Sequence, residues 1–358
     1  MKQKKVLVAM SGGVDSSVAA ALLLKNGYDV TGVFVKQWSD AKEMNGVCTW
    51  KEDRRDALRV AAHLGIPLLT WDFEKEYKDT VLAYMFAEYR AGRTPNPDVL
   101  CNTAIKFKAW LDKALTLGFD ALATGHYAQI EKKKGKYILA RSVDEEKDQT
   151  YFLHQLTKEQ LDHVVFPIGG YKKEAVRQLA RSFSLPTAER EESMGICFVG
   201  EMPMKTFLQQ QIQPTPGAII LSTGEQVGAH DGLPFYTIGQ RHLKLPQAME
   251  QKVGSRPVFV VAKRHDTNEL VVGFEDDPLL YKQEIAVTDL HWVSGQEPSF
   301  PVQCMVRLRH RQELQSCTVE KDQDRIVVHC DVPQRAPTPG QFAVFYTGNV
   351  CLGGGCIA

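Results

Sequence analysis

The sequence predicts an α/β protein in which a doubly wound parallel sheet forms a large N-terminal domain and two small β-rich domains follow, the last a β-barrel. Apolar, strand-like runs alternate with helical patterns as far as residue 212, which is typical of parallel βαβ units. The first run passes through a glycine turn straight into a helix. From residue 213 onward the chain has only short β-type runs and turns. We therefore expect domains at residues 1–212, 213–280 and 281–358.

The N-terminal elements can be located from their end signals. Each helical pattern stops at or just before a glycine, which ends helices well. Strands are expected at residues 6–10, 30–35, 68–71 and 121–124, and helices at 18–24, 52–64, 74–89 and 103–117. Ligands bind at the carboxyl ends of the strands in such sheets. The glycine turn, Gln37 and Gly125 all follow strands, so one pocket is expected to collect them.

The remaining elements are shorter. A solvated hairpin tip is expected at residues 132–136, and helices at 172–183 and 203–211. Alternating apolar residues between turn signals predict strands. These strands are expected at residues 218–221, 235–238, 258–262 and 270–273. A further series of strands begins at residue 285 and includes residues 303–308, 317–320, 325–330 and 341–346.

Composition excludes several classes of protein. Among 358 residues, 43 Lys+Arg balance 43 Asp+Glu, so any nucleic-acid surface must be a local patch. The N-terminus lacks the pattern of a signal peptide, and no apolar run could span a membrane, so we expect a cytoplasmic protein with no membrane partner. None of the eight cysteines forms a C-x-x-C pair. A zinc ribbon or cysteine-ligated cluster is therefore not expected, and no residue is assigned to a metal.

The glycine turn at residues 9–17 has the features of an anion site. A helix start offers free backbone N–H groups and a positive dipole end. Gly12 and Gly13 let the backbone approach a phosphate, and three serines add hydroxyl donors. A capped strand-to-helix turn without a ligand is the structural alternative. The string is neither G-x-x-x-x-G-K-[ST] nor G-x-G-x-x-G.

Two further segments each carry a cysteine. Residues 92–102 hold two prolines in an extended loop, and Cys101 is expected just before a helix, where the dipole would favour its thiolate. Residues 193–200 place Cys197 between two glycines on a short apolar run. Either cysteine, taken alone, is more readily explained as a buried structural residue.

The string from Ser11 to Ser16 resembles the pyrophosphate loop of the N-type ATP pyrophosphatases, which release AMP and pyrophosphate from ATP. Together with the two cysteine segments, it resembles the tRNA-specific 2-thiouridylases over nearly the whole chain. Their other marks are found at residues 125–127, 147–153, 239–241, 290–293 and 350–355. The resemblance implies an adenine nucleotide alpha hydrolase-like fold. It also implies that sulfur is installed at carbon 2 of the anticodon wobble uridine.

The resemblance also implies a role for individual residues. ATP, with a Mg²⁺ ion, would be held by Ala9, Met10, Ser11, Gly12, Gly13, Val14, Asp15, Ser16, Val35 and Gly125. The target base would meet Asn96, Pro97 and Asp98, and the tRNA would meet Lys147, Asp148, Gln149, Arg309 and His310. Cys197 would carry a persulfide from a sulfur-donor protein, and Cys101 would be the second catalytic cysteine.

That chemistry fits these residue types. Adenylation turns the poor leaving oxygen of uracil C2 into a good leaving group, and a persulfide is a soft nucleophile that can attack C2. A second thiol then takes over the bond to the carrier cysteine, as in disulfide exchange. An unpaired anticodon base leaves its stack at low cost.

Several assignments remain open at this level. Asp15 would orient the phosphate loop or a Mg²⁺ ion, or cap the helix, and His126 would be a general acid or a structural histidine. Alternation along a strand would put Arg307, Arg309 and Arg311 on one RNA-facing side, or on a merely solvated one.

Two departures from the family pattern are Ala9, where a glycine is usual, and Val35, near a usual methionine. A third is the run at residues 242–247, which lacks the usual basic, glycine-rich character.

Two other functions compete with this interpretation. An N-type ATP pyrophosphatase acting on a different acceptor would not need the two cysteines. A non-enzymatic tRNA-binding module would not need an intact phosphate loop.

Overall fold

The computed structural model describes residues 3–38, 49–133, 136–191, 203–241, 243, 256–323 and 325–358. Cys48, the segment containing Cys197, and most of residues 242–255 lie outside the described residues. Among the described residues, no helix combines the length and the apolar character that a membrane crossing requires.

A parallel sheet organises the N-terminal part, as predicted, and it has five strands, of which the sequence analysis missed the fifth, β7. Its strands are β1 (Lys5–Ala9), β2 (Asp29–Lys36), β3 (Leu68–Asp72), β4 (Ala121–Ala123) and β7 (Val164–Val165), in the spatial order β3-β2-β1-β4-β7. Order reverses on either side of β1, so the carboxyl ends of β1 and β4 form a topological switch point, where α/β sheets bind ligands.

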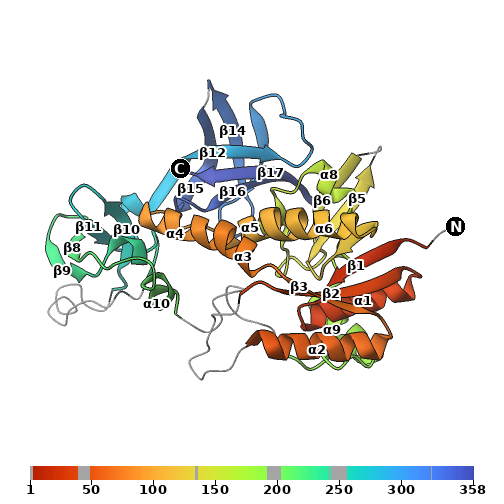
Figure 1. The fold of residues 1–358 in the computed structure, drawn as a ribbon. Helices are drawn as coiled ribbons and strands as arrows, with labels where there is room; N and C mark the ends of the chain where they lie inside the picture. Colours follow the sequence, from red (N-terminus) through yellow and green to blue (C-terminus); the bar gives the residue numbers. More distant parts are fainter. Residues whose placement is uncertain are drawn as a thin grey trace.

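Helices cover both faces of this sheet (Figure 1). One face packs against α1 (Val14–Lys25), α2 (Thr49–Leu64) and α9 (Lys173–Ser182). The other packs against two long helical rods, each interrupted by a π-helical stretch. The rods consist of α3 (Glu74–Tyr77), η1 (Lys78–Leu82) and α4 (Ala83–Arg90), and of α5 (Pro97–Leu100), η2 (Cys101–Trp110) and α6 (Leu111–Thr116). Shorter helices are α7 (Thr150–Leu153), α8 (Lys158–Leu161) and α10 (Met204–Leu208).

The second rod corrects the predicted position of Cys101. The helix begins at Pro97, six residues earlier than the expected start at residue 103, so Cys101 lies within the rod and not before it. Proline suits the first helical position, because its missing N–H would have no partner there. The proline-containing segment therefore starts a helix, and the predicted helix-start position of the thiol is wrong.

The central part is a four-stranded sheet of β8 (Gly217–Leu221), β9 (Gln226–His230), β10 (Phe259–Arg264) and β11 (Glu269–Gly273), in the order β10-β11-β8-β9. The strand predicted at residues 235–238 is wrong: Phe235 is the last residue of a short 3₁₀ helix, η3 (Leu233–Phe235), which contains a proline, and residues 236–238 form no strand. The sequence analysis also missed β9.

The C-terminal strands close into the predicted barrel. They are β12 (Tyr281–Trp292), β13 (Val302–Arg307), β14 (Gln315–Asp322), β15 (Arg325–Arg335), β16 (Phe342–Thr347) and β17 (Val350–Ile357). β12 pairs with both β15 and β17, which joins the two ends of the sheet. A short 3₁₀ helix, η4 (Pro278–Leu280), leads into β12.

The barrel sheet continues into the N-terminal part of the chain. A hairpin of β5 (Ala128–Lys133) and β6 (Lys136–Arg141) lies next to β17, with Ala140 opposite Val350. The Arg141 N–H also donates to the carbonyl of Asn349 over 2.8 Å. Figure 1 shows this hairpin beside the barrel, on the far side of the helical rods from α1 and α2. Residues 128–141 and the C-terminal barrel strands therefore share one sheet.

Candidate functional site

The glycine turn between β1 and α1 forms a polar backbone cradle. Gly12 has a φ of +81°, a conformation that suits glycine, and Gly13 caps α1 without a side-chain bond. The hydroxyl of Ser11 accepts from the Gly13 N–H over 3.3 Å, and those of Ser16 and Ser17 donate back to the Gly13 carbonyl. The serines thus hold the turn in shape and leave the start of the helix to an anion.

Gly125, which follows β4, packs directly against this turn. A Cβ atom at Gly125 would lie 2.7 Å from the backbone nitrogen of Ser16 and 2.8 Å from the carbonyl carbon of Asp15. Neither atom can move without displacing the first turn of α1. The structure therefore brings Gly125 together with the glycine turn, and a glycine is required for that contact.

We expect Gly125→Ala to weaken ATP binding about 10–100-fold, because overpacking of this kind costs about 1–3 kcal/mol. Gly170→Ala is the matched control, since a Cβ there would meet no atom within 4 Å. Equilibrium dialysis with labelled ATP measures both. Unchanged binding by the Gly125 variant would contradict the assignment of this turn to the nucleotide.

Asp15, in the first turn of α1, is held by two partners. The Nζ atom of Lys173 lies 2.7 Å from one carboxylate oxygen, and the hydroxyl of Tyr127 donates to it over 2.9 Å. This arrangement gives Asp15 an orienting role and offsets its charge. Among the described residues, no group of three or more His, Cys, Asp or Glu side chains could hold a metal ion.

Arg190 is a residue of the turn that the sequence analysis missed. Its guanidinium donates to the Gly12 carbonyl over 2.8 Å and forms ion pairs with Asp53 and Asp56 at the start of α2. Arg190 and Gly12 are 178 positions apart in the sequence, so no local signal joins them. The clamp ties the turn to α2 and to the chain just before the Cys197 segment.

Cys101 is buried near the carboxyl end of β2. Its sulfur lies 3.5 Å from the side-chain nitrogen of Gln37, the first residue after that strand. Ala9 and Val35, both assigned to the ATP site, pack against the apolar cluster that contains Cys101. Cys197 lies outside the described residues, so its separation from Cys101 stays a prediction.

The loop expected to meet the target base lies where the three parts of the chain converge. The Asn96 side chain donates to Gln341 over 3.3 Å, and Gln341 donates to the carbonyls of Thr94 and Pro95. The Thr94 hydroxyl also pairs with that of Thr237 in the central part, over 3.1 Å. Gln341 thus holds the backbone of this loop at Thr94 and Pro95, and Thr237 of the central part holds the Thr94 side chain.

Pro97 and Asp98 follow at the start of α5. Pro97 is buried and occupies the first helical position. Burial raises the pKa of Asp98, with the charge of Lys106 acting in the opposite direction. The half-buried position of Asp98 therefore favours the protonated form of its carboxyl more than an exposed position would.

Lys263 of β10 supports the same loop from the central part. Its Nζ atom donates to the Gly92 carbonyl over 3.0 Å, and burial lowers the pKa of Lys263 to about 8. A lowered folded-state pKa means that the unfolded chain holds more protons between pH 8 and 10.5. Stability therefore rises with pH across that window.

We expect the wild type to gain stability relative to Lys263→Met as pH rises through this window, by at most about 1.4 kcal/mol per pH unit. Urea unfolding at several pH values measures the difference. Lys282→Met, at an exposed position, is the control. A Lys263 difference that stays constant with pH would refute the prediction.

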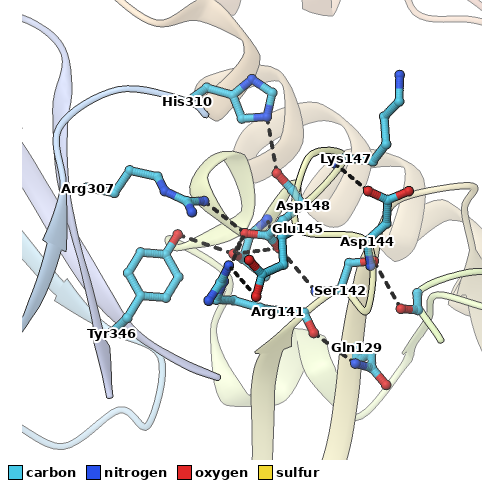
Figure 2. Close-up of polar contacts among 12 residues, drawn as sticks. Gln129, Arg141, Ser142, Asp144, Glu145, Lys147, Asp148, Arg307, His310 and Tyr346 are labelled. Atoms are coloured by element: carbon cyan, nitrogen blue, oxygen red, sulfur yellow. Dashed lines mark hydrogen bonds and ion pairs between the residues drawn. The ribbon is translucent and has the colours of Figure 1, made fainter. Parts of the chain in front are cut away.

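Asp148, expected to contact tRNA, is instead the centre of a buried network (Figure 2). Its side chain is fully buried, and its carboxylate accepts from Arg307 over 3.0 Å and from the Thr150 hydroxyl over 2.9 Å. The backbone N–H of Ser142 donates to it as well, and Arg141 lies within 3.8 Å. Its carboxylate is buried within this network and positions its neighbours, while a tRNA contact of Asp148 itself stays a prediction.

Those neighbours include the other expected tRNA contacts. His310 donates from Nε2 to the Asp148 carbonyl over 3.1 Å, and burial lowers its pKa. Gln149 accepts from the Tyr127 N–H over 2.9 Å, which links this segment to Asp15 through the Tyr127 hydroxyl. The Lys147 side chain points away from the Asp148 carboxylate (Figure 2).

The predicted row of three arginines on one strand face is wrong. β13 ends at Arg307, which turns inward to Asp148, and the chain then bends through Arg309 and reaches a φ of +65° at Arg311. Arg309 donates to the carbonyls of Arg335 and Ala336, and burial lowers its pKa. Of the three arginines, only Arg311 is exposed. Arg307 is buried because it pairs with the buried carboxylate of Asp148.

An open cleft of about 570 Å³ lies beside this network. It carries both signs of charge. Its lining residues are Arg141, Glu145, Glu146, Lys147, Arg307, Arg311, Gln312, Glu313 and Leu314.

His126 has a structural environment. Its Nδ1 atom lies 2.7 Å from the Thr124 hydroxyl, and its ring packs against Phe107 and Phe166. Burial holds the pKa of His126 well below its usual value. The ring is therefore neutral, which favours the structural alternative over the general acid.

Comparison with known proteins gives matches in all three parts of the chain. Residues 4–201 match the family described as tRNA methyl transferase HUP domain, residues 205–274 the tRNA methyl transferase PRC-barrel domain, and residues 282–357 the aminomethyltransferase beta-barrel domain. The tRNA-specific 2-thiouridylases MnmA of Bacillus cereus and Bacillus cytotoxicus are each 48% identical over 358 residues, covering 99% of this chain and 95% of the relative.

Two solved structures are also similar. A 4-thiouridine synthetase–RNA complex with bound ATP matches 58% of this chain and 50% of its own, with 19% identity and a TM-score of 0.36. NMN synthetase from Francisella tularensis matches 53% of this chain and 66% of its own, with 16% identity and a TM-score of 0.32.

Proposed function

This chain belongs to the family of tRNA-specific 2-thiouridylases, and from that premise we propose how its residues transfer sulfur to a tRNA uridine. The protein is a tRNA sulfurtransferase, and the reaction is 2-thiolation of tRNA. Although the matching N-terminal family is described as a tRNA methyl transferase domain, the relatives that match 99% of the chain are thiouridylases. The expected function is confirmed, whereas the roles of individual residues and the order of the chemical steps are proposals.

One observation carries the proposal. The glycine turn after β1, Gln37 after β2 and Gly125 after β4 all lie at the carboxyl edge of the parallel sheet. Gly125 contacts the turn, and Gln37 reaches the sulfur of Cys101. A nucleotide bound at the turn would therefore share this edge with a thiol.

ATP would bind with its phosphates on the first backbone N–H groups of α1, where the dipole of α1 favours negative charge. The adenine would lie toward Ala9 and Val35, which are at the carboxyl ends of β1 and β2. Arg190 would keep the turn open by holding the Gly12 carbonyl away from the phosphates. The positive charge of Lys173 would offset the negative charge of Asp15, which otherwise would repel the phosphates.

The first chemical step would be adenylation of the target uridine. The C2 oxygen attacks the α-phosphorus of ATP, the bond to the β-phosphate oxygen breaks, and pyrophosphate leaves. AMP is then joined to the C2 oxygen, which becomes a good leaving group. The base is the anticodon wobble uridine, held by Asn96, Pro97 and Asp98 in the loop that the barrel and central sheet fix in place.

The second step would deliver sulfur from Cys197, charged beforehand with a persulfide by a donor protein. Its terminal sulfur attacks C2 and AMP leaves. The Cys101 thiolate attacks the Sγ atom of Cys197, the sulfur–sulfur bond to the terminal atom breaks, and a Cys101–Cys197 disulfide remains. A dithiol reductant of the cytoplasm, where we place the enzyme, restores both thiols.

Mg²⁺ enters the proposal only as a companion of the ATP phosphates, its usual partners. The carboxylate of Asp15, the expected protein ligand of Mg²⁺, already accepts hydrogen bonds from Lys173 and Tyr127. The residues at the turn do not fit a dedicated metal site.

Transfer RNA would be held mainly through Lys147, Gln149 and the loop around Arg309 and His310. Asp148 would contribute by fixing that loop and the 147–149 segment to each other. The link from Gln149 through Tyr127 to Asp15 gives the RNA-facing segment a direct connection to the nucleotide turn.

A reconstituted reaction tests the proposal. Unmodified tRNA, ATP and a persulfide donor carrying ³⁵S are incubated with the enzyme, and the anticodon nucleosides are analysed by mass spectrometry. We expect 2-thiouridine at the wobble position, with one AMP and one pyrophosphate released per sulfur. Sulfur at another position, or product formed without ATP, would overturn it.

A further inference from the structure

Three cysteines of the barrel lie side by side on adjacent strands. In the register of the sheet, Cys304 of β13 is opposite Cys317 of β14, and Cys317 is opposite Cys330 of β15. Residues opposite each other across two strands point to the same face of a sheet. Cys317 and Cys330 belong to the barrel's buried interior cluster and Cys304 packs against it, so the register alone brings three thiols together.

The sulfur atoms of the first pair, Cys304 and Cys317, lie close together. The sulfurs of Cys304 and Cys317 are 3.7 Å apart, within hydrogen-bond distance for sulfur. Direct cross-strand partners have Cα atoms about 4.5–5.5 Å apart, inside the range that a disulfide spans. Joining the two sulfurs therefore needs side-chain rotation and only a small adjustment of the backbone.

Access distinguishes the two possible pairs. Cys304 is partly exposed, whereas Cys317 and Cys330 are 4% and 2% exposed. The hydrogen bond between the two sulfurs lowers the pKa of Cys304 and raises that of Cys317. The accessible sulfur is thus the one that becomes a thiolate, the form that oxidants attack.

We propose that Cys304 and Cys317 form a reversible disulfide, a modification site separate from the proposed catalytic cysteines. A peroxide oxidises the Cys304 thiolate to a sulfenic acid, and the Cys317 sulfur displaces its oxygen as water. Two thiols and one hydrogen peroxide give one disulfide and two waters, so the two sulfurs lose the two electrons that the peroxide gains. A dithiol reverses the reaction.

The position of this bond gives it a consequence. Residues 308–314 connect β13 to β14, and they carry Arg309 and His310. Cys304 and Cys317 lie on the two strands that form the stem of this connection. The disulfide would hold the stem closed and restrict the loop. An effect on tRNA binding would follow only if the proposed function is right in assigning this loop to the tRNA.

Peptide mapping tests the bond without relying on activity. The chain with Cys101→Ser and Cys197→Ser is treated with hydrogen peroxide, remaining thiols are alkylated, and the protein is digested with trypsin without reduction. We expect peptide 283–307 linked to peptide 312–321, since Arg307 and Arg311 separate the two cysteines. Dithiothreitol should release both peptides.

Matched variants identify the pair. Cys330→Ala should keep the cross-link, while Cys304→Ala, which alters the partly exposed position and not the core, should abolish it. Recovery of Cys304 and Cys317 as separate alkylated peptides after peroxide treatment would overturn the proposal, and so would a link from Cys317 to Cys330. Because no thiolation is measured, a failure here is distinct from failure of the catalytic proposal.

A second measurement tests the consequence. Oxidised and reduced forms of the same background are compared by hydrogen exchange at residues 305–316. We expect several-fold slower exchange in the oxidised form, reversed by dithiothreitol and absent in Cys304→Ala. Equal exchange in the two forms would show that the bond does not restrict the loop.

Discussion

Cys197→Ser is expected to reduce 2-thiouridine formation at least ~10³-fold, since removal of an essential nucleophile commonly costs that much or more, while ATP- and tRNA-dependent pyrophosphate release continues. Serine cannot carry a persulfide, but it leaves the nucleotide turn and the target-base loop intact. Pyrophosphate release and nucleoside mass spectrometry, run on the same samples, separate the two steps.

Cys101→Ser is expected to block a later step, the release of the transferred sulfur from Cys197. With Cys197 intact, a persulfide can still form, but no second thiol takes over its carrier sulfur. Cys351→Ala is the control, since Cys351 is a buried cysteine of the barrel. Full product formation by both the Cys101 and the Cys197 variants would instead favour an acceptor chemistry that needs no sulfur carrier.

Arg307→Met is expected to lower the free energy of unfolding by roughly 3 kcal/mol, because it leaves the carboxylate of Asp148 buried without its closest cationic partner. Asp148 is 1% exposed and Arg307 is 4% exposed, so water cannot replace the lost contact. Urea denaturation measures the change. We also expect weaker tRNA binding in a filter assay, because the network fixes the backbone that His310 contacts.

Two further variants make the prediction specific. Arg307→Met combined with Asp148→Asn removes both charges and should recover more than half of the lost stability, since a neutral pair is cheaper to bury than one uncompensated charge. Arg311→Met, at the exposed end of the same bend, should change stability little. If the single and double variants were equally unstable, the charge argument would fail.

The sequence was sufficient for features encoded over short stretches. Each strand of the parallel sheet is an apolar run bounded by turn residues, and the turn from Ser11 to Ser16 has its own chemical signature. The spacing of the short C-terminal strands predicted a small barrel or a sandwich, and the pairing of β12 with both β15 and β17 shows the barrel. The last strand, β17, was missed because three consecutive glycines, 353–355, disguise it. At Gly353 a Cβ would lie 2.0 Å from the His291 carbonyl, so the neighbouring strand requires a glycine there.

Contacts between distant parts of the chain were not predictable in the same way. Asp148 appeared to be a solvated residue of a motif, and only the folded chain places Arg307 against it. Arg190 has no local mark, although it holds the Gly12 carbonyl. The start of the helix before Cys101 was misplaced because two prolines in three residues favour a loop as well as a helix start.

The shared sheet of β5, β6 and β17 has a consequence for co-translational folding. A ribosome makes the hairpin long before β17, the eight-residue strand that lies next to it. Until then the nascent chain presents an unpaired strand edge, which invites association with other chains. Synthesis of β17, rather than completion of the first domain, therefore marks the point at which this edge of the hairpin is covered.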